Sequence, residues 1–184
     1  MVYMYSCCMK VISKIAEKNR YSVPLILFFI AGSSLAAAFV AEYVFDLKPC
    51  ILCIYQRIPF AVIVALSLIC MMLPDRINFS KPLLCLSGLA FFVGSGIASF
   101  HVGVEQKWWA GTEDCGGIEA DTFEKLRAMI LNAPAVRCDE PQWEFLGITM
   151  AGYNVVYSLI LGIACFYMVR KIASQQVARG GNAK

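Results

Sequence analysis

Charged residues are scarce in this sequence of 184 residues: Lys, Arg, Asp and Glu together make up 16%, and there is a single histidine. Soluble globular chains carry about 25% charged residues. Hydrophobic residues account for 59% of the chain, and the few charges are clustered, so that long stretches contain none. This distribution excludes a large soluble domain such as a Rossmann fold or a barrel enzyme.

The uncharged stretches are long enough to be membrane spans. They contain 21, 17, 23 and 25 residues, at positions 21–41, 58–74, 82–104 and 145–169. About 20 apolar residues cross a bilayer as a helix. We therefore expect an all-α membrane protein, a four-helix transmembrane bundle, with helices near residues 22–45, 51–73, 82–104 and 148–169.

The basic residues predict the orientation of these spans. Residues 1–20, 74–82 and 170–184, which flank the spans on one side, contain ten Lys or Arg. The loops on the opposite side, residues 46–57 and 105–144, contain six. Lys and Arg concentrate in cytoplasmic flanks. Both termini are therefore expected in the cytoplasm. The loop between helices one and two and the loop between helices three and four are expected on the outer side.

The same boundaries predict the organisation of the chain. A cytoplasmic segment at 1–21 and a cytoplasmic tail at 170–184 enclose a membrane domain at 22–169, whose outer loops lie at about 46–50 and 105–147. Within the long loop, residues 121–132 combine apolar residues at helical spacing with charges between them. This pattern predicts an amphipathic helix on the outer membrane surface, or a small helix packed within the loop.

Nine cysteines divide into two groups under this topology. An oxidising exterior makes the four outer thiols a pairable set: Cys50, Cys53, Cys115 and Cys138. The other five fall in the cytoplasm or within spans: Cys7, Cys8, Cys70, Cys85 and Cys165. Those in the spans are expected to act as small hydrophobic residues in helix packing, and the sequence assigns no role to the adjacent pair near the N-terminus.

Cys50 and Cys53 form a C-x-x-C at the expected start of a helix, directly after Pro49. A helix N-terminus favours a thiolate, and Arg57 follows at helical spacing on the same face. A structural zinc site would require a second closely spaced pair, and attachment of c-type haem would require histidine where Ile54 stands. Two structural disulfides remain the alternative, although so small a loop gives little entropic stabilisation.

Three segments resemble one family. Residues 47–57 have the sequence LKPCILCIYQR, residues 100–105 FHVGVE and residues 138–147 CDEPQWEFLG. Together they are similar to the disulfide bond formation protein B (DsbB) family, the quinone-dependent thiol oxidases of the bacterial inner membrane. The resemblance covers roughly residues 22–169 and leaves the two terminal segments outside.

The resemblance implies a role for each outer cysteine. The loop pair Cys115 and Cys138 would accept electrons from DsbA, a soluble periplasmic thiol oxidase, with Cys115 forming the mixed disulfide. Cys50 would exchange with the loop pair and Cys53 would engage the ring of a quinone, ubiquinone or menaquinone, beside Arg57. No metal is expected.

The remaining polar candidates are less specific. His101 is expected either to contact a quinone or relay a proton, or to cap and pack at the membrane interface. Glu105 is expected either to contribute in the same way as His101 or to face water at the end of its span. Trp108, Trp109 and Trp143 are expected to be interfacial anchors, since aromatic residues gather at both membrane surfaces whatever the function.

The predicted activity is that of a membrane thiol oxidase that reoxidises a DsbA-type protein and reduces a quinone. Two alternatives stay open at this point. One is a non-enzymatic four-span scaffold stapled by two structural disulfides. The other is a related thiol oxidoreductase with a dedicated partner.

Overall fold

The computed structural model describes residues 21–73, 79–112, 115, 122–124, 127 and 136–181, with side chains of the last segment as far as Ser174. Most of these residues belong to four long helices and one short hairpin. In chain order the elements are α2 (Ser22–Tyr43), α3 (Ile51–Met72), α4 (Ser80–Glu105), β1 (Glu144–Phe145), β2 (Ile148–Thr149) and α6 (Met150–Gly181).

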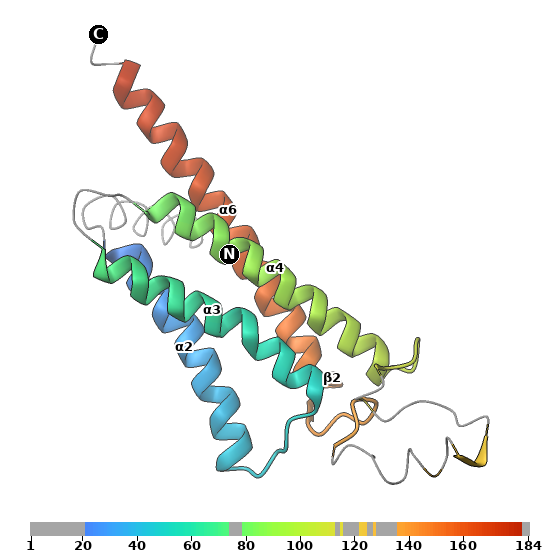
Figure 1. Cartoon of the computed structure of the whole chain (residues 1–184). Coiled ribbons are helices and arrows are strands. Elements are labelled where there is room, and N and C mark those ends of the chain that lie inside the picture. The colour runs from blue at the N-terminus through green and yellow to red at the C-terminus, as the bar shows by residue number, and fades with distance from the viewer. Residues whose placement is uncertain are drawn as a thin grey trace.

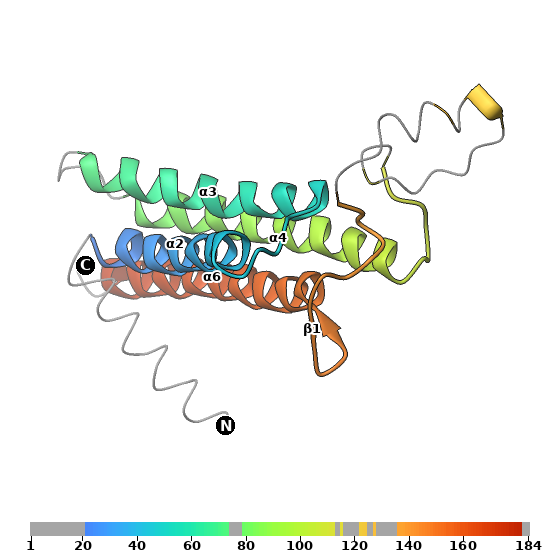
Figure 2. The same cartoon turned by 90° about the horizontal axis from the view of Figure 1, so that it is seen from below.

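The four helices lie side by side as a bundle (Figure 1). Seen from below, all four run along one common direction (Figure 2). The most extensive packing is between α4 and α6, and α3 packs against both α2 and α4. The α2–α3 connection, the C-terminal end of α4 and the hairpin gather at one end, and the C-terminal end of α6 projects from the other (Figure 1).

Each helix is long and apolar enough to cross a membrane. Their inner faces form a core around Phe91, Ile63 and Leu83, which are at most 2% exposed. Their outer faces are apolar as well, with large exposed side chains such as Phe29, Ile69, Leu89, Val93, Ile160 and Ile163. Apolar side chains on the core face and on the outward face together favour a bundle surrounded by lipid. The predicted fold class, a four-helix transmembrane bundle, is confirmed.

The helix ends differ from the predicted ones. Helix α2 ends two residues before the predicted limit and α3 one residue before it. Helix α4 extends beyond both predicted limits, and α6 begins at Met150 and continues to Gly181. The limit predicted at residue 169 is the end of the apolar run, and the helix continues beyond that run. Nothing in the following residues interrupts a helix, so the backbone continues as one.

A hairpin that the sequence analysis did not predict precedes α6. Its two-residue turn has positive φ at both positions, 53° at Leu146 and 74° at Gly147, which is the backbone of a type I′ turn and suits glycine. The ring of Trp143 stacks on Phe145, and the Tyr153 hydroxyl donates to the Phe145 carbonyl at 3.0 Å. The hairpin is thus fixed against the first turns of α6.

Two of the cysteines within the spans pack as predicted: Cys165 is buried in the core, and Cys70 packs against the core residues. Cys7 and Cys8 lie outside the described residues. So does most of the segment 121–132, and with it the predicted amphipathic helix.

Candidate active site

The beginning of α3 carries two thiols. Cys50 is the N-cap residue: its backbone is extended, with φ −74° and ψ 170°, and its Sγ accepts a hydrogen bond from the backbone N–H of Cys53 at 3.4 Å. The two Sγ atoms lie 2.9 Å apart and are not joined in a disulfide. The N-terminus of a helix stabilises negative charge, so α3 itself favours a thiolate at Cys50.

The surroundings of Cys50 lower the pKa of its thiol from 9.0 to about 4. The largest cause is the Cys53 thiol, which donates a hydrogen bond to Cys50, and His101 acts in the same direction while burial opposes both. The thiolate is the nucleophile of thiol–disulfide exchange. Cys50 is therefore the activated member of the pair at neutral pH.

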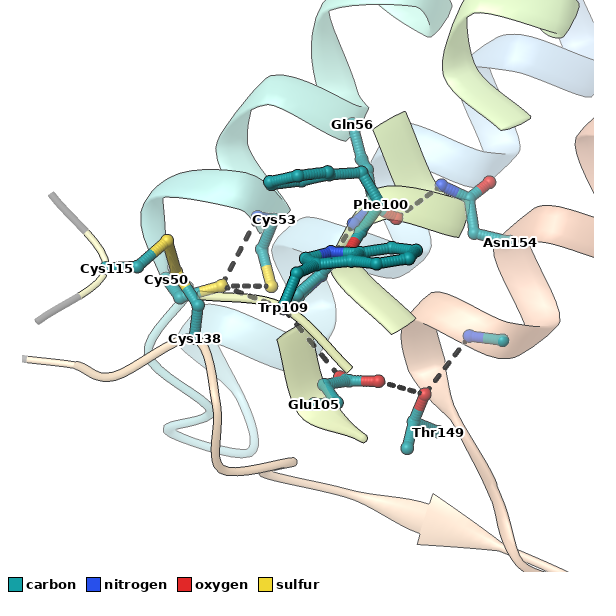
Figure 3. A network of polar contacts seen from close by, with 12 residues as sticks. Cys50, Cys53, Gln56, Phe100, Glu105, Trp109, Cys115, Cys138, Thr149 and Asn154 are labelled. Atoms are coloured by element: carbon teal, nitrogen blue, oxygen red, sulfur yellow. Dashed lines mark hydrogen bonds and ion pairs between the residues drawn. A yellow bond between two sulfur atoms is a disulfide. The ribbon is translucent and has the colours of Figure 1, made fainter. Parts of the chain in front are cut away.

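Cys115 and Cys138 form a disulfide, which is the pairing implied by the family resemblance. Both are 1% exposed, and they pack with Cys50 in one small cluster that also holds Leu52 and Val104. Figure 3 shows the disulfide beside Cys50. The fold thus brings Cys50 and Cys53, at the start of α3, together with Cys115 and Cys138, from the loop between α4 and α6.

Short local contacts hold the loop disulfide. The backbone N–H of Cys115 donates to the Thr112 carbonyl at 2.8 Å, and that of Cys138 donates to the Cys115 carbonyl at 3.5 Å. Next to Cys138, the Arg137 guanidinium donates to both carboxylate oxygens of Asp139 and so lowers the pKa of that carboxyl. These contacts hold the backbones of Cys115 and Cys138 next to each other and next to Thr112.

His101 lies between the thiols and the interior of the bundle. Its ring is 3% exposed. Nε2 is 3.5 Å from the Cys50 Sγ and 3.7 Å from Oε1 of Glu105, while Nδ1 is 2.8 Å from Nε2 of Gln56. The histidine is therefore buried and bonded on both sides, rather than capping the end of a helix at the interface.

Glu105 does not face water, and the prediction that it does is wrong. Its side chain is 5% exposed, and Oε2 accepts a hydrogen bond from the Thr149 hydroxyl at 2.6 Å. The same hydroxyl accepts from the backbone N–H of Gly152 at 3.1 Å, so that Thr149 caps α6 and holds the carboxylate. The reason for the error is that β2 and the start of α6 cover the end of α4.

The three tryptophans are exposed at this end of the bundle, as interfacial anchors would be. Trp109 also has a local role. Its ring stacks on Phe100 and its indole N–H donates to the Phe100 carbonyl at 3.0 Å. A Cβ at Gly103 would come within 1.9 Å of this ring, so only glycine at that position lets the chain fold back over the end of α4.

Arg57 lies two turns into α3, on the face that carries Cys53. Its guanidinium forms an ion pair with Glu42 of α2 and lies 5.2 Å from the centre of the Phe39 ring. Both charged side chains are about one-fifth exposed. The sequence analysis expected the cation but not its partner, which comes from a different helix.

A cavity of about 700 Å³ adjoins these groups. Its wall includes both thiols of α3, Arg57, His101 and Gln56, and most of the remainder is supplied by apolar and aromatic side chains of α2, α3, α6 and the loop: Leu35, Ala38, Ala41, Leu47, Phe60, Trp143, Phe145, Met150 and Tyr157. A large cavity lined mainly by apolar side chains, with a few polar groups among them, is typical of a small-molecule binding site.

A metal site is the other use that this group of ligands suggests. The Sγ atoms of Cys50 and Cys53 and a ring nitrogen of His101 lie within 4.8 Å of one another. Two thiolates on a tetrahedral zinc ion would be about 3.8 Å apart, given a Zn–S bond of about 2.3 Å. The observed separation of 2.9 Å is shorter than that, so the two sulfurs as placed do not match a tetrahedral zinc site.

Comparison with known proteins agrees with this geometry. Residues 20–168 match the family described as disulfide bond formation protein DsbB. The chain belongs to the DsbB family. Membership in the family, together with four spans, makes it a multi-pass membrane protein and a disulfide-forming oxidoreductase, which disfavours the non-enzymatic scaffold.

Individual relatives of this DsbB-family chain cover most of its length. A disulfide bond formation protein B of Xanthomonas campestris pv. campestris is 30% identical over 150 residues, which is 78% of this chain and 86% of that protein. One of Nitrosococcus oceani is 27% identical over 77% of this chain and 86% of its own length. An uncharacterized protein of Rickettsia prowazekii is 26% identical over 160 residues, 82% of this chain and 91% of its own.

The sequence analysis did not predict two further polar residues of the site, Gln56 and Asn154. Asn154 donates to Oε1 of Gln56 at 2.7 Å, and its own Oδ1 accepts from the Ser158 hydroxyl at 2.9 Å. The available signal was polar residues inside uncharged spans, where side chains of this kind need hydrogen-bonding partners. Figure 3 shows Gln56 and Asn154 facing each other from α3 and α6.

Proposed function

We propose that this protein oxidises a DsbA-type periplasmic dithiol protein and transfers the two electrons to ubiquinone or menaquinone. The observation that carries the proposal is the position of Cys50. Its thiolate packs against the Cys115–Cys138 disulfide on one side and, with Cys53, lines the apolar cavity on the other. One sulfur atom thus adjoins both the loop pair and the cavity.

The reaction begins at the loop disulfide. A thiolate of the reduced partner attacks the Sγ of Cys115, Cys138 leaves as a thiolate, and the second partner thiol resolves the mixed disulfide. The products are an oxidised partner and a loop dithiol. The loop dithiol then reduces a Cys50–Cys53 disulfide in a second exchange, which restores the loop disulfide and leaves two thiols at the start of α3.

In that product the loop pair is oxidised and the α3 pair is reduced. The Cys50 thiolate and the Cys53 thiol then lose two electrons and the proton of Cys53 as their disulfide closes. A bound quinone would accept both electrons, together with the proton of Cys53 and one further proton from solvent. The protein's own contribution is to hold the two sulfurs in line and to keep Cys50 ionised.

The residues around the cavity suit a quinone. Apolar and aromatic side chains would hold the ring and its tail, and Cys53 would lie nearest the ring. Arg57 would supply a positive charge to a carbonyl oxygen, where negative charge grows as electrons arrive. The low dielectric of the membrane boundary strengthens this interaction relative to water.

Energetics favour a quinone over a soluble thiol pool as the acceptor. A DsbA-type dithiol has a reduction potential of about −120 mV and the glutathione pool one of about −240 mV, so oxidation of the dithiol by glutathione would be unfavourable by roughly 5.6 kcal/mol for two electrons. A lipid-soluble acceptor with a more positive reduction potential removes this unfavourable free energy. It also explains why reactive thiols lie at the edge of a membrane span.

The proposed location is the bacterial inner membrane with both termini cytoplasmic. The excess of Lys and Arg in the flanks at that end supports this orientation. It puts the four cysteines of the site on the periplasmic side, where disulfides persist.

The decisive experiment is quinone reduction by the purified protein in the presence of a reduced DsbA-type protein. We expect partner oxidation and quinone reduction in equal amounts. A variant with Cys115→Ser and Cys138→Ser should lose the partner-dependent reaction but still reduce quinone with a small dithiol. If the intact protein reduces no quinone with either donor, the proposal is wrong.

A further inference from the structure

Four polar side chains form one chain of hydrogen bonds from the third turn of α6 to the thiols. Ser158 contacts Asn154 at 2.9 Å, Asn154 contacts Gln56 at 2.7 Å, and Gln56 contacts His101 at 2.8 Å. Ser158, Gln56 and His101 are at most 7% exposed. Polar groups as buried as these usually have hydrogen-bond partners within the protein.

The hydrogen bonds of the chain run in one direction. The Ser158 hydroxyl donates to Oδ1 of Asn154, and Nδ2 of Asn154 donates to Oε1 of Gln56. The oxygen of Gln56 is therefore occupied, and its Nε2 is the atom that faces the histidine. An amide NH₂ has hydrogens to give and no lone pair to offer. Nδ1 of His101 must accept, so the ring proton belongs on Nε2.

The other edge of the imidazole leads to the same assignment. Nε2 faces the Sγ of Cys50 at 3.5 Å and Oε1 of Glu105 at 3.7 Å. A thiolate and a carboxylate both accept hydrogen bonds and donate none. A proton on Nε2 satisfies this side of the ring, whereas a lone pair there would face negative charge.

We propose that Gln56, Asn154 and Ser158 are positioning residues that hold His101 as the neutral tautomer protonated at Nε2. In that form the ring donates to Cys50 and stabilises its thiolate, and it has no lone pair with which to take a proton from this sulfur. The tautomer is imposed from α6, on the side of the ring away from the sulfur. Its consequence for the rate of electron transfer rests on the proposed function; the tautomer itself does not.

The single histidine of the chain makes the test direct. The two ring nitrogens of ¹⁵N-histidine-labelled full-length protein in lipid nanodiscs give one pair of resonances, which distinguish the tautomers. Above neutral pH we expect protonation at Nε2 alone, both with Cys50 and Cys53 reduced and with their disulfide closed. A tautomer that changes on oxidation would show that the sulfur sets it, and would overturn the proposal.

Variants of the positioning residues separate this role from a merely structural one. Gln56→Glu, measured above neutral pH where the new carboxylate is ionised, puts an acceptor beside Nδ1 and should move the proton there. Asn154→Leu frees the oxygen of Gln56, lets its amide turn, and should replace the single tautomer by a mixture. Retention of protonation at Nε2 alone in both folded variants would refute the inference.

Ser95→Ala is the matched control. Ser95 donates to the Val155 carbonyl at 3.1 Å between α4 and α6, so this change removes a buried interhelical hydrogen bond without touching the histidine. It should leave the imidazole resonances in place. In the Gln56→Glu protein, by contrast, loss of a donor to a charged sulfur should slow quinone reduction by about tenfold or more. Because the resonances need neither quinone nor partner, failure of the proposed function would leave this result standing.

Discussion

The guanidinium of Arg57 forms an ion pair with Glu42, across the contact between α3 and α2. The pair lies beside the cavity and is about four-fifths shielded from solvent, so its charges are held in a medium of low dielectric. Arg57 therefore has a structural partner as well as a place in the site. A substitution of Arg57 therefore changes both the stability of the fold and the charge in the site, unless Glu42 is substituted as well.

The first prediction uses this pair to separate the two effects. Arg57→Met leaves the Glu42 carboxylate unpaired at the membrane boundary and should lower the free energy of unfolding by about 1–3 kcal/mol. The double variant with Glu42→Gln should recover most of that loss, because no buried charge remains. Thermal denaturation of the two variants in detergent measures the difference. Equal stability of the single and double variants would show that an unpaired Glu42 carboxylate costs nothing at this position.

A second prediction concerns electron delivery. Both the Arg57→Met protein and the double variant should require more quinone for half-maximal rate and should turn over more slowly, because the positive charge beside the acceptor is gone. Arg57→Lys should restore the rate only in part, since an ammonium lacks the planar fork of guanidinium. Quinone-dependence curves decide the point. Unchanged curves in the stable double variant would leave Arg57 as a structural residue.

A third prediction assigns the order of the two cysteine pairs. Cys115→Ser should abolish oxidation of the DsbA-type partner while Cys50 and Cys53 still form a disulfide from quinone. The reason is that Cys50 and Cys53 line the cavity themselves, so electrons can pass from this pair to a bound quinone without Cys115. Thiol trapping followed by mass spectrometry reports each pair separately. A fully reduced α3 pair in the presence of ample quinone would contradict the proposed relay.

How far the sequence predicts this structure depends on the kind of feature. The four spans follow from the uncharged runs, because the bilayer sets both their length and their composition. The positions of Cys50, Cys53 and Arg57 follow from helical spacing alone. These features are local or are imposed by the membrane, so a single segment is enough to predict them.

The polar network did not follow from any segment. Gln56 and Asn154 are 98 positions apart and meet only because α3 and α6 both pack against α4. The burial of Glu105 likewise depends on β2, whose two residues are too few to show a strand pattern. Such contacts are consequences of assembly, which is why an apparently interfacial histidine and glutamate prove to be buried.

A fourth prediction is that the other five cysteines are dispensable for turnover: Cys7, Cys8, Cys70, Cys85 and Cys165. Where they are described, they pack against the core or lie in spans away from the thiol cluster. A variant with all five replaced by Ala or Ser should retain the rate of partner oxidation if it inserts and folds. Loss of activity in a correctly folded variant would reveal a further reactive thiol.

The last prediction is the pH dependence of Cys50. The Cys53 thiol, and after it His101, lower the pKa of Cys50 to about 4 in the folded dithiol protein, against 9.0 for the isolated group. A depressed pKa means that ionisation of Cys50 stabilises the fold fully above about pH 9, and that this contribution disappears as the pH falls through about 4. Between these limits Cys50 is a thiolate only while the protein is folded.

The corresponding measurement is the rate of alkylation of Cys50 by a small reagent, in proteins that keep the loop disulfide and have Cys53 replaced. Cys53→Ser retains a donor and should keep the rate nearly constant from neutral pH down to about pH 5. Cys53→Ala removes the donor, so the pKa of Cys50 should rise toward its ordinary value and the rate should fall about tenfold per pH unit below it. Coinciding profiles for the Ser and Ala proteins would mean that the helix N-terminus and His101, rather than the neighbouring thiol, keep Cys50 ionised.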